Sequence, residues 1–233
     1  MSADASPSTR AAFADGARAI APIVIGVFPF GLIAGVAAVE AGLTTVQALA
    51  ASPMIFAGAS QLAAMDLIGR GSPVLVIVLT ALVINARFAM YSAALAPPFA
   101  SLPLRHRAVA AYLLTDQAFA VSTIRFARTD EPALARFAFY LGSALVLALT
   151  WHTATIVGVV VGSGVPPEWS LDFAVPLVFI ALVFPAITDR ATRVAAIVAA
   201  IASASLRGMP LNLGLLTAAL IGIVAGLIAR GRQ

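Results

Sequence analysis

Residues Pro73–Leu95 read PVLVIVLTALVINARFAMYSAAL. A helix needs about 20 predominantly apolar residues to cross the hydrocarbon core of a bilayer, and this run supplies them. It also contains one charged residue, Arg87, past its midpoint. A charge at such a depth costs on the order of 2.5–3.5 kcal/mol in a transmembrane helix. The stretch therefore predicts a helical membrane protein and indicates where its function is to be sought.

The rest of the chain has the same character. Of its 233 residues 61% are hydrophobic and 10% are charged, whereas a soluble domain is about half apolar and a quarter charged. These values exclude a single water-soluble core, and no run has the strict alternation of a β-barrel strand. We expect an all-α polytopic membrane protein with a flexible polar N-terminus over residues 1–18 and one transporter domain over residues 19–233.

Breaks rich in Gly and Pro divide the chain into eight apolar segments, which we expect to be transmembrane. They run over Ala19–Val39, Val46–Ile68, Pro73–Leu95, Ala108–Phe126, Arg136–Gly162, Leu171–Ile187, Thr192–Leu206 and Leu211–Ala229. Segments six and seven are short, which fits either thin spans or the broken half-helices of transporters. Gly-x-x-x-Gly spacings that begin at Gly31, Gly158 and Gly222 indicate close contacts between helices.

The distribution of arginines predicts the orientation, because cytoplasmic loops carry an excess of positive charge. With eight spans and both termini in the cytoplasm, the inner side holds Arg10, Arg18, Arg70, Arg125, Arg128, Arg136, Arg190, Arg193, Arg230 and Arg232. The outer side holds Arg105, Arg107 and Arg207. A re-entrant fourth segment would explain Arg105 and Arg107, but it would turn over the rest of the chain. We therefore expect the fourth segment to span.

Several function classes are excluded or disfavoured by composition. The chain has no Cys, so disulfides, thiolate metal sites and Cys nucleophiles are excluded. The chain has only two His, so we do not expect a metal site built from several His side chains. The arginines punctuate apolar segments instead of forming a patch for nucleic acid, and no phosphate-binding Gly-rich loop with a Lys occurs. We expect no cofactor, no metal and no nucleic-acid partner.

Two charged residues lie at membrane depth in the predicted spans. Asp116 falls in the middle of segment four, and Arg87 lies in segment three. Either the two neutralise each other and join their helices, or they flank a polar cavity at the midplane. The second interpretation is favoured because ionisable residues inside a membrane usually mark a substrate or ion path. Tyr91 shares a helical face with Arg87, whereas Asn85 points roughly 160° away and shares its face with Ser92. Either Asn85 holds another helix while Arg87 meets the cavity, or the reverse. Thr115 lies on the helical stripe next to that of Asp116.

Segment two contributes uncharged polarity in Phe56-Ala-Gly-Ala-Ser-Gln61. Together with Pro53, the side chains of Ser60 and Gln61 predict a distorted helix that lines a cavity. The alternative is helix packing with one interhelical hydrogen bond. In segment five, His152 is either a proton-coupling group or a packing residue that is hydrogen-bonded within the bundle.

Three of these motifs together resemble the AzlC family. They are Phe56-Ala-Gly-Ala-Ser-Gln61, Asn85-Ala-Arg87 with Tyr91, and Leu114-Thr-Asp-Gln-Ala-Phe119, in the order and spacing of that family. The resemblance implies the large subunit of a bacterial branched-chain amino acid exporter, multi-pass in the inner membrane, with a small AzlD-type membrane partner. Gln117 and Phe88 stand where the family often has an acidic residue and a His, which bears on substrate range and proton coupling.

This implied function fits the charges, because an amino acid is a zwitterion. We expect Arg87 to take the carboxylate in a bidentate fork and Asp116 to take the ammonium, with Gln61, Ser60, Asn85, Thr115 and Tyr91 as further substrate ligands. Two other classes stay open, a channel or transporter for another small solute and an intramembrane hydrolase that would use Ser60 and His152. We expect a transporter and no enzyme.

Overall fold

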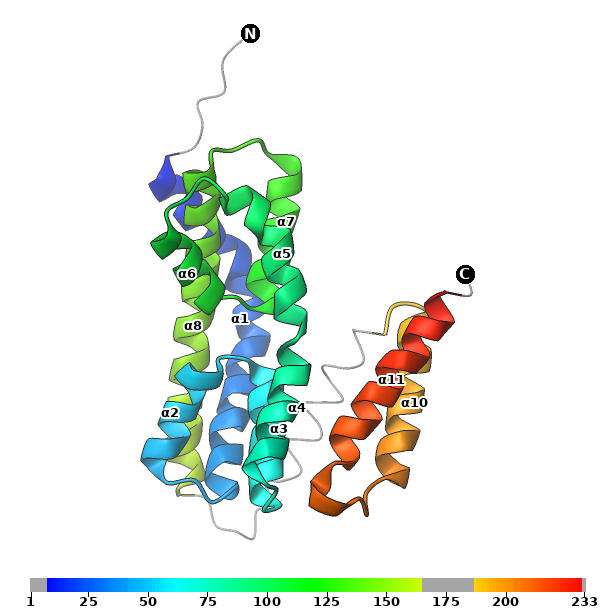
Figure 1. Cartoon of the computed structure of the whole chain (residues 1–233). Coiled ribbons are helices and arrows are strands. Elements are labelled where there is room, and N and C mark those ends of the chain that lie inside the picture. The colour runs from blue at the N-terminus through cyan, green and yellow to red at the C-terminus, as the bar shows by residue number, and fades with distance from the viewer. Residues whose placement is uncertain (1–7, 165–186, 232–233) are drawn as a thin grey trace. The chain divides into compact units, whose positions relative to one another are not determined.

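The computed structural model describes residues 8–164 and 187–231, and every regular element in that part of the chain is helical (Figure 1). The all-α fold is thereby confirmed. Predicted segment six lies outside the described residues except for its last one. The chain divides into a first unit, Met1–Leu32 with Asn85–Gly158, and a second unit, Ile33–Ile84 with Val159–Gln233. Each unit is described by itself.

Two long helices, α1 (Thr9–Glu40) and α8 (Ala133–Gly162), contribute residues to both units. Glycines bring their backbones together. In the first unit, Gly142 packs against the backbone of Phe13, and Gly158 packs against the carbonyl of Leu32. In the second unit, Gly162 contacts Val36. The close helix contacts predicted from glycine spacing are therefore confirmed for this pair of helices.

A methyl group at Gly142 should destabilise the protein, because its Cβ would overlap with the carbonyl oxygen of Phe13. Overpacking of this kind costs about 1–3 kcal/mol, so Gly142→Ala should lower the midpoint of thermal unfolding in detergent. The control is Gly26→Ala on α1, where a Cβ meets no atom within 4 Å and where Ala should be neutral or stabilising. Equal melting of the two variants would contradict the packing described here.

Helix α1 begins earlier than the sequence predicts. Its first residue is Thr9, so residues 9–18 are helical and do not belong to a flexible segment. The Ser8 side chain accepts a hydrogen bond from the Ala11 amide at 3.2 Å, and Ala12 is fully buried beside Phe139. Packing against α8 therefore orders a stretch that looks like a polar lead-in by composition.

The second predicted segment is two helices, α2 (Thr45–Ile55) and α3 (Gly58–Gly69), instead of one. They are separated at Phe56, which has a left-handed backbone with φ of 37°. Pro53 lies within the last turn of α2, where a proline weakens the helix. A left-handed conformation is uncommon for a bulky residue and costs energy that the surrounding structure must offset. The predicted distortion is confirmed and is larger than a kink.

Both ends of this helical hairpin, α2–α3, lie at the same end of the second unit (Figure 1). Helix α2 begins five residues after α1 ends, with a capping box between Thr44 and Gln47. At the other end of the hairpin, the Cβ position of Gly69 comes within 3.6 Å of the Cα of Ala41, next to the end of α1. The chain therefore enters and leaves the hairpin at one place.

The third predicted segment is present as α4 (Val74–Asn85) and α5 (Arg87–Phe99). Only Ala86 separates them, and it keeps right-handed helical angles. Together Val74–Phe99 are long and apolar enough to cross a membrane, as are α1 and α8. No other helix of the described residues meets that length and composition.

The fourth predicted segment is again a hairpin, of α6 (Leu104–Tyr112) and α7 (Asp116–Arg128). The ring of Phe99, at the end of α5, contacts the ring of Phe126 near the end of α7 at 5.9 Å and that of Phe137 at the start of α8 at 6.1 Å. His106, in the first turn of α6, contacts Phe137 at 5.0 Å. Both ends of the hairpin α6–α7 thus lie at one end of the first unit, and the expectation of a single helix over this segment is wrong.

The two hairpins bear on the predicted membrane topology, which stays a prediction. A hairpin whose ends lie together would not carry the chain across a membrane, so we expect the second and fourth segments each to remove one crossing. With two crossings removed, α8 would keep the orientation predicted from the sequence. Arg105 and Arg107 would then lie on the cytoplasmic side and Arg70 on the outer side. The outer side would hold two arginines, Arg70 and Arg207, instead of three.

The described C-terminal part is a pair of helices, α10 (Arg190–Ser205) and α11 (Gly214–Arg230), which lie side by side (Figure 1). Gly222 contacts Ala195 and Ala199 of α10, as the glycine spacing predicts. Asp189 caps α10. The amide of Thr192 donates to its carboxylate at 2.7 Å, and this hydrogen bond lowers the pKa of Asp189.

Candidate functional site

Arg87 and Asp116 meet in the first unit. Arg87 Nη2 lies 3.1 Å from Asp116 Oδ2, and the two side chains are 32% and 38% exposed. Each is the first residue of a helix, Arg87 of α5 and Asp116 of α7. The charge pair predicted from the sequence is therefore formed. Asp116 lies directly after the break of the hairpin α6–α7 and not in the middle of a helix.

Tyr91 holds the second carboxylate oxygen of Asp116. Its hydroxyl donates to Oδ1 at 3.0 Å, from one helical turn beyond Arg87, as the shared face predicts. The Tyr91 ring stacks on Phe119 with a centroid distance of 4.2 Å and an interplanar angle of 14°. The Tyr91 ring and the start of α7 are thereby fixed to each other, and both oxygens of the carboxylate have partners.

Thr115 positions Asp116 because it is the last residue of the break between α6 and α7. It has an extended backbone and is the N-cap of α7, with its Oγ1 accepting from the Ala118 amide at 3.3 Å. Asp116 then occupies the first turn, where a helix stabilises negative charge. The role of Thr115 as a direct substrate ligand stays a prediction.

Two buried polar atoms, one on Arg87 and one two residues earlier in the sequence, have no hydrogen-bond partner among the described residues. They are Arg87 Nε and Asn85 Oδ1. Buried polar groups are usually paired, so this unused donor and this unused acceptor require an explanation. Arg87 Nε could form a fork with Nη2 toward an incoming carboxylate, and Asn85 Oδ1 could accept from an ammonium group.

The other predicted ligands, Ser60 and Gln61, belong to the second unit. Both are fully buried. Ser60 Oγ donates to the Ala57 carbonyl at 3.0 Å beside the break of the hairpin α2–α3. The Gln61 side-chain amide has no hydrogen-bond partner for either of its polar atoms among the described residues. Binding of substrate by these two residues stays a prediction.

His152 and Ser60, the pair that an intramembrane hydrolase would need, both bond to backbone carbonyls nearby. The Nδ1 atom of His152 lies 2.6 Å from the carbonyl oxygen of Ala148, one turn earlier in α8. Coupling of transport to His152 stays a prediction. Within residues 8–164 and 187–231, no three acidic, His or Cys side chains are grouped so as to hold a metal ion.

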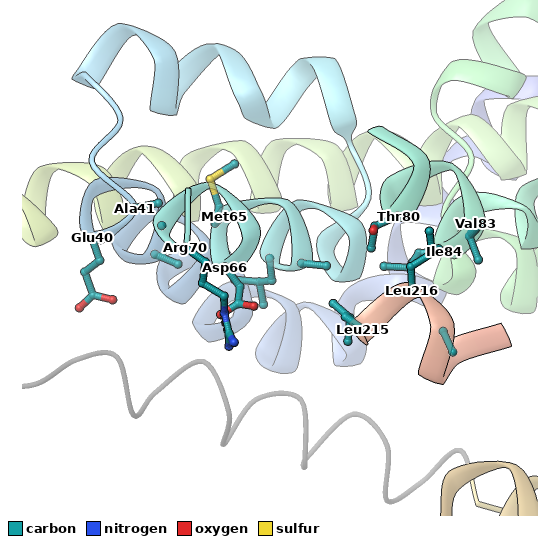
Figure 2. A pocket seen from close by; sticks show the side chains of 15 residues that line it. Glu40, Ala41, Met65, Asp66, Arg70, Thr80, Val83, Ile84, Leu215 and Leu216 are labelled. Atoms are coloured by element: carbon teal, nitrogen blue, oxygen red, sulfur yellow. Dashed lines mark hydrogen bonds and ion pairs between the residues drawn. The ribbon is translucent and has the colours of Figure 1, made fainter. Parts of the chain in front are cut away.

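A large pocket in the second unit was not predicted (Figure 2). Its lining includes Asp66 of α3 and Arg70, the residue that caps the end of α3. These two form the predicted helix-end ion pair at 2.9 Å. Thr80 of α4 also lines it, and this hydroxyl is buried without a hydrogen-bond partner among the described residues. The lone hydroxyl in the apolar run Val74–Asn85 was the signal in the sequence that could have identified it.

The family model of the AzlC protein matches residues 22–165. The chain belongs to the AzlC family. This match includes both helical hairpins and the Arg87–Asp116 pair, so the membership covers the part of the molecule in which the candidate site lies. The resemblance of the three polar motifs to the AzlC family is thereby confirmed.

Two relatives of this AzlC-family chain match over nearly its full length. An uncharacterised membrane protein of Archaeoglobus fulgidus is 32% identical over 92% of this chain and 94% of its own. The inner membrane protein YgaZ of Escherichia coli is 27% identical over 93% of this chain and 88% of its own. No solved structure matches. Both names agree with a membrane protein, as the apolar helices require.

Proposed function

We propose that this AzlC-family protein is the transport subunit of an inner-membrane exporter of branched-chain amino acids. The observation that carries the proposal is the ion pair of Arg87 and Asp116 at a break between membrane helices. The two charges have opposite sign, as the two charged groups of an amino acid have. The protein can therefore bind a zwitterion without a net change of charge inside the membrane.

Binding is an exchange of partners in this proposal. The substrate carboxylate takes the place of Asp116 on Arg87, using Nη2 and the unpaired Nε as a side-on fork. The substrate ammonium takes the place of Arg87 on Asp116, and Asn85 Oδ1 accepts a further hydrogen bond. Without substrate the two side chains neutralise each other, which avoids an isolated charge at membrane depth. With substrate both stay neutralised.

The aromatic side chains beside the pair favour an apolar substrate. Tyr91 and Phe119 are stacked next to Asp116, and Phe88 contacts Tyr91 edge-on at 6.0 Å. A branched aliphatic side chain would gain from burial against these rings, at roughly 25 cal/mol for each Å² of apolar surface removed from water. The three rings offer no ion-pair partner to a second charge on the substrate. These features support valine, leucine and isoleucine over acidic or basic amino acids.

The function also requires a small AzlD-type membrane protein as a partner, as the family resemblance implies. The test is efflux of preloaded labelled leucine and valine from cells that express this chain, with and without the small protein. Saturable, partner-dependent efflux is expected, and Asp116→Asn should abolish it because a neutral amide cannot hold the ammonium. Membrane levels of each variant serve as the control.

Two results would contradict the proposal. Flux that does not saturate and does not depend on Asp116 would indicate a channel for small solutes instead of a binding site. Absence of leucine and valine efflux in every combination, with both proteins present in the membrane, would exclude these substrates. Labelled small zwitterions of other classes would then be tested on the same cells.

A further inference from the structure

The first unit has a small apolar groove between α5 and α6 that is separate from the Arg87–Asp116 site. Its lining is Ser92, Leu95, Ala96 and Phe99 of α5, Arg107, Ala110 and Ala111 of α6, and Leu114 just after α6. We call it the α5–α6 groove. Its volume is about 130 Å³. Arg107 is its only charged lining residue, so the groove combines one cation with apolar walls.

Arg107 is exposed and no described acidic side chain pairs with it, unlike Arg125 and Arg136 near the same end of the unit. Arg125 binds Glu131 at 2.6 Å, and Arg136 binds Asp130 at 3.2 Å. Arg105, two residues before Arg107, is likewise exposed and unpaired among the described residues. The start of α6 thus has uncompensated positive charge.

The position of this charge in the helix makes it more unfavourable. Arg105 and Arg107 lie two and four residues after Pro103, the N-cap of α6, which offers no side-chain hydrogen bond to the first turn. The N-terminal end of a helix carries partial positive charge, which repels cations and attracts anions. The helix would therefore be stabilised by an anion bound near its start.

We propose that the α5–α6 groove binds an anionic phospholipid, with the phosphate on Arg107 and part of one acyl chain against the apolar lining. Exposed apolar side chains along α6, among them Leu104, Val109 and Tyr112, place the helix beside hydrocarbon. In the orientation that we expect for the two hairpins, the start of α6 lies on the cytoplasmic side, where anionic headgroups attract basic residues. A phospholipid matches both the cation and the apolar walls, whereas a free anion matches only the first.

The test uses the full chain in phosphatidylcholine vesicles with spin-labelled phosphatidylglycerol or spin-labelled phosphatidylcholine. The immobilised fraction in the electron paramagnetic resonance spectrum gives the relative affinity for each lipid. Arg107→Gln should reduce the preference for phosphatidylglycerol roughly fivefold, the effect of one basic side chain near an anionic surface. Arg128→Gln is the matched control, because Arg128 is also exposed and lies outside the groove.

A second pair of variants tests the apolar part. Ala111→Phe should obstruct the groove and lower the affinity for both lipids, whereas Ala94→Phe on an exposed position of α5 outside the groove should not. Equal affinity for the two lipids in the wild type, or equal losses in Arg107→Gln and Arg128→Gln, would overturn the proposal. Complete displacement of the labelled lipid by excess inorganic phosphate would also overturn it, because the acyl chain would then contribute nothing.

Discussion

Arg87→Lys should lower saturable leucine efflux roughly tenfold to a hundredfold while the protein stays folded. Lysine keeps the charge near Asp116 but has no planar fork, so it loses the side-on contact that Nε and Nη2 offer to a carboxylate. A hydrogen bond to a charged group contributes about 1.5–3 kcal/mol, which corresponds to that range. The measurement is the initial rate of efflux against internal leucine concentration. Full efflux in Arg87→Lys would contradict the assigned role of Arg87.

Two further variants separate loss of binding from loss of stability. Arg87→Gln leaves Asp116 without its cation, an arrangement that costs on the order of 2.5–3.5 kcal/mol at membrane depth, so both stability and efflux should fall. In the double variant Arg87→Gln/Asp116→Asn no unpaired charge remains. Its unfolding midpoint should return toward the wild-type value while efflux stays absent. Restored efflux would show that the pair has only a structural role.

Single cysteines should label in a pattern that only the two hairpins explain. The chain has no Cys, so each introduced thiol is the sole target of a membrane-impermeant maleimide. Thr45→Cys and Pro73→Cys, at the two ends of the hairpin α2–α3, should both react from the outer side. Ser101→Cys and Asp130→Cys, at the ends of the hairpin α6–α7, should both react only after the membrane is opened. All four positions are exposed.

The eight-span prediction gives a different result at two of these positions. If segments two and four each crossed the membrane, Pro73→Cys would react from the inside and Ser101→Cys from the outside. Thr45→Cys should react from the outer side and Asp130→Cys from the inner side under both topologies. These two variants therefore serve as controls for membrane integrity. Reaction of Pro73→Cys from the inside would contradict the hairpin α2–α3 as described.

The helical class and the long helices could be predicted from the sequence, because length and hydropathy determine which segments can enter a membrane. The breaks in segments two and four could not be placed. Hydropathy does not reveal the break at Phe56, because this residue is apolar although its backbone is left-handed. It does not reveal the break after α6 either, because Leu113 and Leu114 follow that helix and neither is a Gly or a Pro. Arg105 and Arg107 were the misfit of the eight-span prediction, and two hairpins taken together would place both on the cytoplasmic side.

The charge pair at the site could be predicted because Arg87 and Asp116 would each cost free energy alone at membrane depth. Two charges of opposite sign in neighbouring segments therefore indicate a pair. The hydrogen bond from Tyr91 to Asp116 could be predicted only in part. The spacing of four residues placed Tyr91 on the same helical face as Arg87, but it did not identify Asp116 as the acceptor. What the sequence cannot supply is which polar atoms stay unused. Arg87 Nε and Asn85 Oδ1 are recognisable as such only from the surrounding contacts.

The hairpin α2–α3 has a consequence for the biogenesis of the protein. Its helices have 11 and 12 residues, about 17 Å each at 1.5 Å per residue, too short to span alone. The segment Val46–Ile68, with Asp66 as its only charged residue, is nevertheless long enough to be inserted as one helix by the translocon. In the predicted orientation, such an insertion would draw Arg70 into the cytoplasm and invert what is synthesised after it. We therefore expect correct assembly to keep residues 45–69 out of a spanning state until α4 has been inserted.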